Sequence, residues 1–279
     1  MNLFSQIASA SAEPTRRPLN LAFWREQSRI VLALILIDMR TRFGGSFLSY
    51  SIAILWPLIH VGVVTIGYIL VNKVAPLGGG DPAIFIGCAI LPYCLAFYPA
   101  RMIGSAVFGG KMFLNFPIVA PMHLIVARII LEILAAIVVA MLFVAILSMA
   151  GTDVVPVNVN TALAAIGATI YFGVCIGIFM AMMMAVFGIF GSHAVIVSLI
   201  LMYIASGSYV PLPLLPAKMK ALGYYNPIFN LIEWLRMAYY VEYSDALVNK
   251  TMIFVVGGLL ALIGLAGERF VRGRFVERI

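Results

Sequence analysis

The chain has 279 residues, of which 63% are hydrophobic and 10% are charged, and its formal net charge is +7. Soluble domains contain roughly 45–50% apolar and about 25% charged residues, so this composition excludes a soluble globular protein and predicts one all-α integral membrane domain. The basic residues collect beside apolar segments rather than on one face. They therefore indicate membrane topology and not nucleic-acid binding.

The N-terminal region divides into a tail and a helix. Residues 1–20 are small and polar and include Pro14 and Pro18, which is typical of a disordered cytosolic tail. The segment 23–42 places eight apolar residues, Ile30–Ile37, between charged flanks. Eight helical residues rise only about 12 Å, whereas a bilayer core is about 30 Å thick. A helix that lies along the cytosolic membrane interface is predicted.

Six apolar segments are predicted to cross the membrane, since a span needs about 20 residues. They cover approximately residues 47–71, 83–108, 124–149, 159–186, 193–209 and 250–267. The stretch 154–217 contains no Asp, Glu, Lys or Arg and is long enough for two spans and their turn. Pro92 and Pro99 predict kinks in the second span, and Gly173-x-x-x-Gly177 has the spacing of closely packed helices.

The segment 210–245 is predicted to form a re-entrant helical hairpin on the extracytoplasmic side, before the last span. Three prolines between 211 and 216 prevent regular helix there. The following helix, Ile228–Val241, is too polar to span and too apolar for a free loop. The residues expected to have a structural role in the hairpin are Asn226, Pro227, Glu233 and Arg236. Residues 271–279 are expected to form a basic cytosolic tail.

The positive-inside rule places both termini in the cytosol, because thirteen Lys and Arg residues fall on one side of the predicted spans and five on the other. The larger set is Arg16, Arg17, Arg25, Arg29, Arg40, Arg42, Arg101, Lys111, Arg128, Arg269, Arg272, Arg274 and Arg278. The smaller set is Lys73, Lys218, Lys220, Arg236 and Lys250.

The sequence shows no catalytic, metal or nucleotide motif. The three histidines lie in different segments, and neither H-E-x-x-H nor G-x-S-x-G occurs. A phosphate loop at Gly104–Met112 fails in either frame, because position 110 is Gly where Lys is required and Met112 replaces the Ser or Thr that holds magnesium. The first, fourth and fifth spans lack the acidic residues of ion-coupled transporters. We therefore expect no enzyme and no cofactor on this chain, and any pumping would use energy from another subunit.

The loop 111–117 indicates a protein partner, because its apolar residues are predicted to face the cytosol. The alternative is that Phe113 and Phe116 anchor in the headgroup region. Arg128 and Glu132 follow, four residues apart on one predicted helix. In the structural interpretation the two side chains form an ion pair with each other near the helix end. In the functional interpretation Arg128 contacts a passing anion.

Three groups of residues resemble the permeases of type-2 ABC exporters, specifically those for capsular polysaccharide, over residues 20–270. The first is Asp38-x-Arg40-Thr41-Arg42-Phe43-Gly44 with Leu48, Tyr50 and Pro57. The second is Leu114-Asn115-Phe116-Pro117-Ile118-Val119-x-Pro121 with Ala127-Arg128 and Leu131-Glu132, and the third is Asn226-Pro227-Ile228 with Ile232-Glu233 and Arg236. The chain departs from the family at Ser49 and Ile52, where Gly and Trp are frequent.

The resemblance implies a homodimer of six-span chains in the bacterial inner membrane, with a cytosolic ABC ATPase dimer that binds ATP and Mg. The cargo would be a lipid-linked acidic polysaccharide, and export proteins of the periplasm and outer membrane are further candidate partners. The expected ATPase-docking residues are Arg25, Arg29, Lys111, Phe113, Asn115, Phe116 and Pro117. The expected substrate-pathway residues are Arg42, Tyr50, Trp56, Tyr93, Phe97, Tyr98, Arg101 and Arg128, where aromatic rings could stack on sugars and arginines attract anionic glycan.

Several alternatives remain open at this point. The aromatic residues could instead form an interfacial belt or pack in the core. The cargo could be another lipid-linked polymer, such as O-antigen or teichoic acid. A membrane scaffold or enzyme outside the ABC class is the third alternative, and co-purification of an ATPase would distinguish it.

Overall fold

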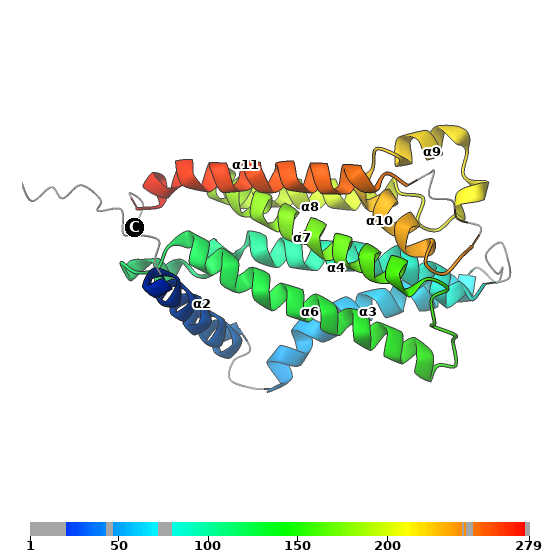
Figure 1. Cartoon of the computed structure of the whole chain (residues 1–279), viewed down its shortest axis with the longest axis horizontal. Coiled ribbons are helices and arrows are strands. Elements are labelled where there is room, and N and C mark those ends of the chain that lie inside the picture. Colours follow the sequence, from blue (N-terminus) through cyan, green and yellow to red (C-terminus); the bar gives the residue numbers. More distant parts are fainter. Residues whose placement is uncertain (1–20, 43–46, 72–79, 242, 244–247, 277–279) are drawn as a thin grey trace, which may run out of the picture.

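The computed structural model describes residues 21–42, 47–71, 80–241, 243 and 248–276. The described residues form helices and turns without a strand, in an elongated bundle whose long helices run along its length (Figure 1). The helices are α2 (Leu21–Arg42), α3 (Phe47–Val71), α4 (Pro82–Gly104), α5 (Ala106–Gly109), η1 (Lys111–Asn115), α6 (Pro121–Met149), α7 (Val159–Phe187), α8 (Ile189–Ile204), η2 (Leu212–Leu214), α9 (Ala217–Gly223), α10 (Pro227–Arg236) and α11 (Lys250–Val276). The tail predicted at 1–20 lies outside the described residues.

Five helices are long and apolar enough to cross a membrane: α3, α4, α6, α7 and α11. An all-helical, multi-pass membrane protein is therefore confirmed. The span predicted over 193–209 is not among these five helices, because the helix in this region, α8, has only 16 residues. Such a helix is about 24 Å long, less than the roughly 30 Å of a bilayer core.

The boundary of α8 was predicted wrongly because one glycine makes the turn before it. Gly188 has a φ of 65°, and this single left-handed residue joins α7 to α8. Residues 189–192, which fall between the predicted spans 159–186 and 193–209, are therefore already helical. At the other end α8 stops at Ile204, five residues earlier than expected.

Three further boundaries differ from the sequence prediction. The segment 83–108 is divided between α4 and α5 at Ser105. Helix α6 begins at Pro121 and not near 124, because proline at the first helical position loses no hydrogen bond. Helix α11 continues to Val276, so much of the predicted tail 271–279 is helical, while 277–279 lie outside the described residues.

Different structural elements lie at the two ends of the bundle (Figure 1). At one end, here called the α2 end, lie α2, η1, the turn between α7 and α8, and the end of α11. At the other, the α9 end, lie α9 and α10 with the starts of α4 and α11. Successive long helices run in opposite directions between these ends, as consecutive membrane crossings require.

Helix α4 is the centre of the bundle. In an apolar segment of 18 residues of α4, 89% of the residues are buried, compared with 17% in the corresponding segments of α3 and α11. Helix α7 packs closely against it through the Gly173-x-x-x-Gly177 spacing. A Cβ on Gly173 would lie 2.9 Å from Ala96 Cα, and one on Gly177 would lie 2.7 Å from Ile103 Cβ. The glycines thus permit the close approach of α4 and α7.

Replacing Gly173 with alanine is expected to lower stability by about 1–3 kcal/mol, since the added methyl would meet α4 backbone atoms. Gly167→Ala on the same helix is the matched control, because a Cβ there meets nothing within 4 Å. Thermal unfolding in detergent should show a lower Tm for Gly173→Ala alone. Equal Tm values for the two variants would contradict the close-packing argument.

Candidate functional site

At the α2 end, an ion pair joins the predicted interface helix to the bundle. Arg128 on α6 donates a hydrogen bond to Asp38 Oδ1 on α2 at 2.8 Å. The partner expected from the sequence, Glu132, lies farther from the guanidinium, at 3.9 Å. Both carboxylates thus face one arginine, and the shorter contact fixes α2 against α6.

His123 makes a second connection between the same two helices. Its Nδ1 accepts a hydrogen bond from the Ala120 backbone N–H at 2.9 Å. The ring proton therefore resides on Nε2, which donates to Gln27 Oε1 on α2 at 2.6 Å. His123 both caps the start of α6 and positions α2 across it.

The loop between α5 and α6 presents only part of the predicted docking surface. Lys111, Asn115, Phe116 and Pro117 are exposed, and the Phe116 side chain is 59% exposed. Phe113 is half-buried and packs against Leu34, Leu124 and Ala127. It holds η1 against α2 and α6 and does not face outward, which corrects the expectation for this residue.

The two predicted docking residues on α2 are exposed beside this loop. Arg25 and Arg29 line a pocket of about 360 Å³ together with Ile118, which follows η1. The α2 surface and the loop are thus parts of one continuous face at this end of the bundle.

Four of the predicted pathway aromatics on α3 and α4 have described side chains, and their environments differ. Trp56 is 60% exposed, whereas Phe97 and Tyr98 are half-buried. Tyr93 is only 5% exposed and stacks on Tyr203 with ring centroids 4.2 Å apart. Its ring packs against protein, as in the core-packing alternative, and its sugar-stacking role stays a prediction.

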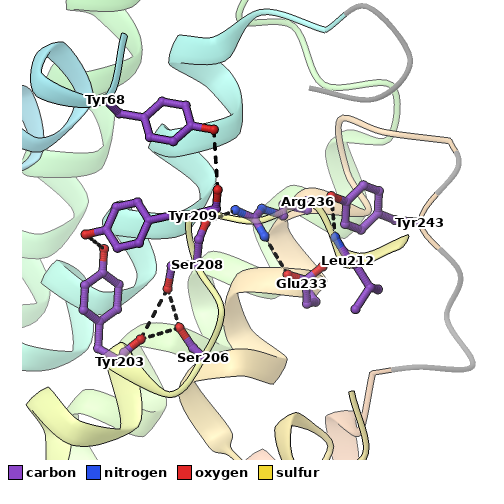
Figure 2. Close-up of polar contacts among 9 residues, drawn as sticks. All are labelled: Tyr68, Tyr203, Ser206, Ser208, Tyr209, Leu212, Glu233, Arg236 and Tyr243. Carbon is purple, nitrogen blue, oxygen red and sulfur yellow. Dashed lines mark hydrogen bonds and ion pairs between the residues drawn. The ribbon is translucent and has the colours of Figure 1, made fainter. Parts of the chain in front are cut away.

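Residues that the sequence interpretation omitted complete this group of rings. His60 Nδ1 lies 3.0 Å from the Tyr98 hydroxyl, and the hydroxyls of Tyr203 and Tyr209 lie 3.0 Å apart. Tyr68 stacks on Tyr209 with ring centroids 6.3 Å apart, and both residues are drawn on the left of Figure 2. We call His60, Tyr68, Tyr93, Phe97, Tyr98, Tyr203 and Tyr209 the aromatic cluster.

Of the predicted pathway arginines, Arg101 is exposed near the α2 end of α4, and Arg128 belongs to the ion pair with Asp38. The structure describes no side-chain environment for Arg42 or Tyr50. The structure thus places Arg101 and Arg128 at one end of the bundle, apart from the buried aromatic ring of Tyr93.

At the α9 end, two asparagines organise the predicted hairpin. Asn226 Oδ1 accepts from the Ile228 N–H at 3.0 Å, and its Nδ2 donates to Met202 O at 2.7 Å. Pro227 follows at the first helical position of α10. Asn230 is fully buried, and its Oδ1 accepts from the Asn249 N–H at 2.6 Å. These bonds connect α8, α10 and the start of α11.

Glu233 and Arg236 form a fully buried ion pair on α10. Arg236 Nη1 donates to Glu233 Oε1 at 2.7 Å, and Nη2 donates to the Ser208 carbonyl (Figure 2). The guanidinium also lies 3.9 Å from the ring centroid of Phe85 on α4. Burial raises the pKa of Glu233, while the adjacent Arg236 opposes that shift. The pair attaches the hairpin to the central helix.

Tyr243 contacts the segment before α9 in the same region. Its hydroxyl accepts a hydrogen bond from the Leu212 N–H at 3.4 Å (Figure 2). Burial raises the Tyr243 pKa to about 12. The four hairpin residues predicted as structural thus lie at the start of α10, at Asn226 and Pro227, and in its buried ion pair, at Glu233 and Arg236.

No protein-family model matches the chain, and no curated protein matches it. The described residues contain no group of three or more His, Cys, Asp and Glu side chains that could hold a metal ion.

Sequence reasoning missed Asp38 as the partner of Arg128, and it named no partners for His60 and His123. The position of Asp38, directly after the apolar run Ile30–Ile37, could have marked it as a residue that needs a partner. The identity of that partner could not be inferred, because Arg128 is 90 positions away in the sequence.

Proposed function

We propose that the chain is the permease subunit of an ATP-driven ABC exporter that moves a lipid-linked acidic capsular polysaccharide across a bacterial inner membrane. The observation that carries the proposal is the α2 end, where an exposed cytosolic loop is coupled to α2 and α6 by side-chain contacts. The three sequence motifs described above supply the family assignment. The proposal also includes a second copy of the chain.

In the proposed topology, α8 is the sixth crossing and the α2 end faces the cytosol. This orientation follows from the positive-inside rule, which counts the Lys and Arg residues on each side of the spans. Among the described residues, Lys218, Lys220, Arg236 and Lys250 lie at the α9 end. A locally thinner bilayer would accommodate the short α8.

The proposed energy source is a cytosolic ABC ATPase dimer that binds ATP and Mg. Its docking surface would comprise Arg25, Arg29 and the exposed residues of the 111–117 loop. Since Phe113 packs against Leu34 and Leu124, a displacement of this loop would move α2 and α6 together. This mechanical connection is what a subunit that receives its power from a partner requires.

In the proposed pathway, Trp56 and Arg101 contact the glycan, since both are exposed on neighbouring helices. Aromatic faces suit sugar rings and arginine suits acidic groups. Phe97 and Tyr98 lie on the same helix as Arg101, and the exposed parts of their rings would line the conduit that a second copy completes. Periplasmic and outer-membrane export proteins would receive the polymer at the α9 end.

The test is affinity purification of the tagged chain from native membranes, followed by reconstitution in vesicles. An ATPase should co-purify, and the vesicles should hydrolyse ATP and carry the polymer only when both proteins are present. If the polymer is instead O-antigen or teichoic acid, the cargo assignment is wrong and the exporter assignment holds. Transport or ATP hydrolysis by the chain alone would overturn the proposal.

A further inference from the structure

A pocket of about 390 Å³ opens between α2, α5, η1 and α6. This volume lies within the roughly 300–1,000 Å³ of small-molecule sites. Most of its wall is apolar, and its larger apolar side chains are Leu34, Phe108, Met112, Phe113 and Leu124. Asp38 and Arg128 stand together in the same wall. The pocket therefore combines an apolar surface with one acid–base pair.

Asp38 uses only one of its two carboxylate oxygens. Oδ1 accepts from Arg128, whereas Oδ2 is buried and accepts no hydrogen bond from the described residues. The other polar residue nearby, Ser105, directs its hydroxyl to the Met102 carbonyl at 3.1 Å. A buried carboxylate oxygen without a donor is costly. A ligand that carries an N–H donor next to an apolar body would complement this pocket.

The depth of the pocket in the bilayer indicates what that ligand is. Helix α6 has 29 residues and is about 43 Å long, so it exceeds a hydrocarbon core of about 30 Å by roughly 6 Å at each end. Arg128 lies about 10 Å from the start of α6 by the same rise per residue. The Asp38–Arg128 pair thus lies near the boundary between headgroups and hydrocarbon, where phospholipids present their charged groups.

We propose that this pocket binds a phospholipid with a primary-ammonium headgroup. The ammonium donates to Asp38 Oδ2, the lipid phosphate faces Arg128, and an acyl chain packs against the apolar wall. A choline headgroup carries no N–H and cannot make the bond to Asp38. The site is independent of the export function proposed above, because it needs only the chain and a membrane.

Native mass spectrometry of the purified full chain would test this selectivity. The probe is an equimolar mixture of phosphatidylethanolamine and phosphatidylcholine with identical acyl chains. Single-lipid adducts should favour phosphatidylethanolamine roughly tenfold, as expected for one charge-assisted hydrogen bond. Asp38→Asn should bring the ratio to near one, since it removes the charge with little change in shape.

Two further variants test whether the lipid preference depends on this pocket or on any loss of a carboxylate. Asp153→Asn removes an exposed carboxylate at the opposite end of α6 and should keep the tenfold preference. Gly109→Leu should reduce adducts of both lipids, because Gly109 lines the pocket and a Cβ there meets nothing within 4 Å. Equal binding of the two lipids by the unmodified chain, or an unchanged preference in Asp38→Asn, would overturn the proposal.

Discussion

Replacing Glu233 with alanine should destabilise the protein by about 3–5 kcal/mol, the largest effect that we expect from one substitution. The change leaves the Arg236 guanidinium buried without its carboxylate, in a site where both side chains are 0% exposed. The remaining contacts of Arg236, with the Ser208 carbonyl and the Phe85 ring, do not neutralise its charge. Thermal unfolding of the purified chain in detergent should show a large fall in Tm.

A double substitution distinguishes the cost of an unpaired charge from the value of the pair. Glu233→Leu with Arg236→Met removes both charges and should recover most of the lost Tm, since apolar residues of similar volume can replace a buried pair. Lys218→Ala removes an exposed cation from α9 and serves as the surface control. If Glu233→Ala unfolds at the same temperature as Lys218→Ala, the buried pair does not stabilise the hairpin.

The long helices were predictable because a membrane-spanning helix requires a long apolar segment with few charges in the sequence. Helix α7 begins at Val159 as expected and extends one residue farther than predicted. The turn before α8 was not predictable, because the residues after Gly188 are apolar or small and suit both a turn and a helix. The positive φ of Gly188 determines where α7 ends and α8 begins.

Burial within α4 could not be inferred from the sequence. Tyr93 lies near the middle of a helix that is buried on nearly all sides. In such a helix the hydrophobic pattern has no polar face from which an exposed side could be inferred. Aromatic identity suggested a contact with sugars, whereas packing against Tyr203 and Phe97 explains the residue.

The tertiary pairs were predictable only where both partners lie on one helix. Glu233 and Arg236 are three residues apart, so their pairing could be inferred from helical geometry. The same reasoning gave Glu132 as the partner of Arg128 and missed Asp38, whose contact depends on how α2 crosses α6. Local spacing thus identifies pairs within helices but not the contacts that fix helices together.

Replacing Phe116 with aspartate should abolish recovery of the proposed ATPase with the chain. Phe116 is 59% exposed in the loop that follows η1, and a carboxylate there would be placed in an apolar contact. A central aromatic contact is worth about 2 kcal/mol or more, so affinity should fall by roughly 30-fold or more. Pull-down of the ATPase by the tagged variant, at matched expression, measures the loss.

Tyr225→Asp provides the matched control, because it adds the same charge at an aromatic residue that is 76% exposed at the opposite end of the bundle. Both variants should elute as single species with unchanged helix content, since neither side chain belongs to the buried core. Loss of the ATPase from Phe116→Asp alone would place the docking surface at the α2 end. Equal recovery by the two variants would remove Phe116 from that surface, and equal loss would show that added charge, not position, disrupts the complex.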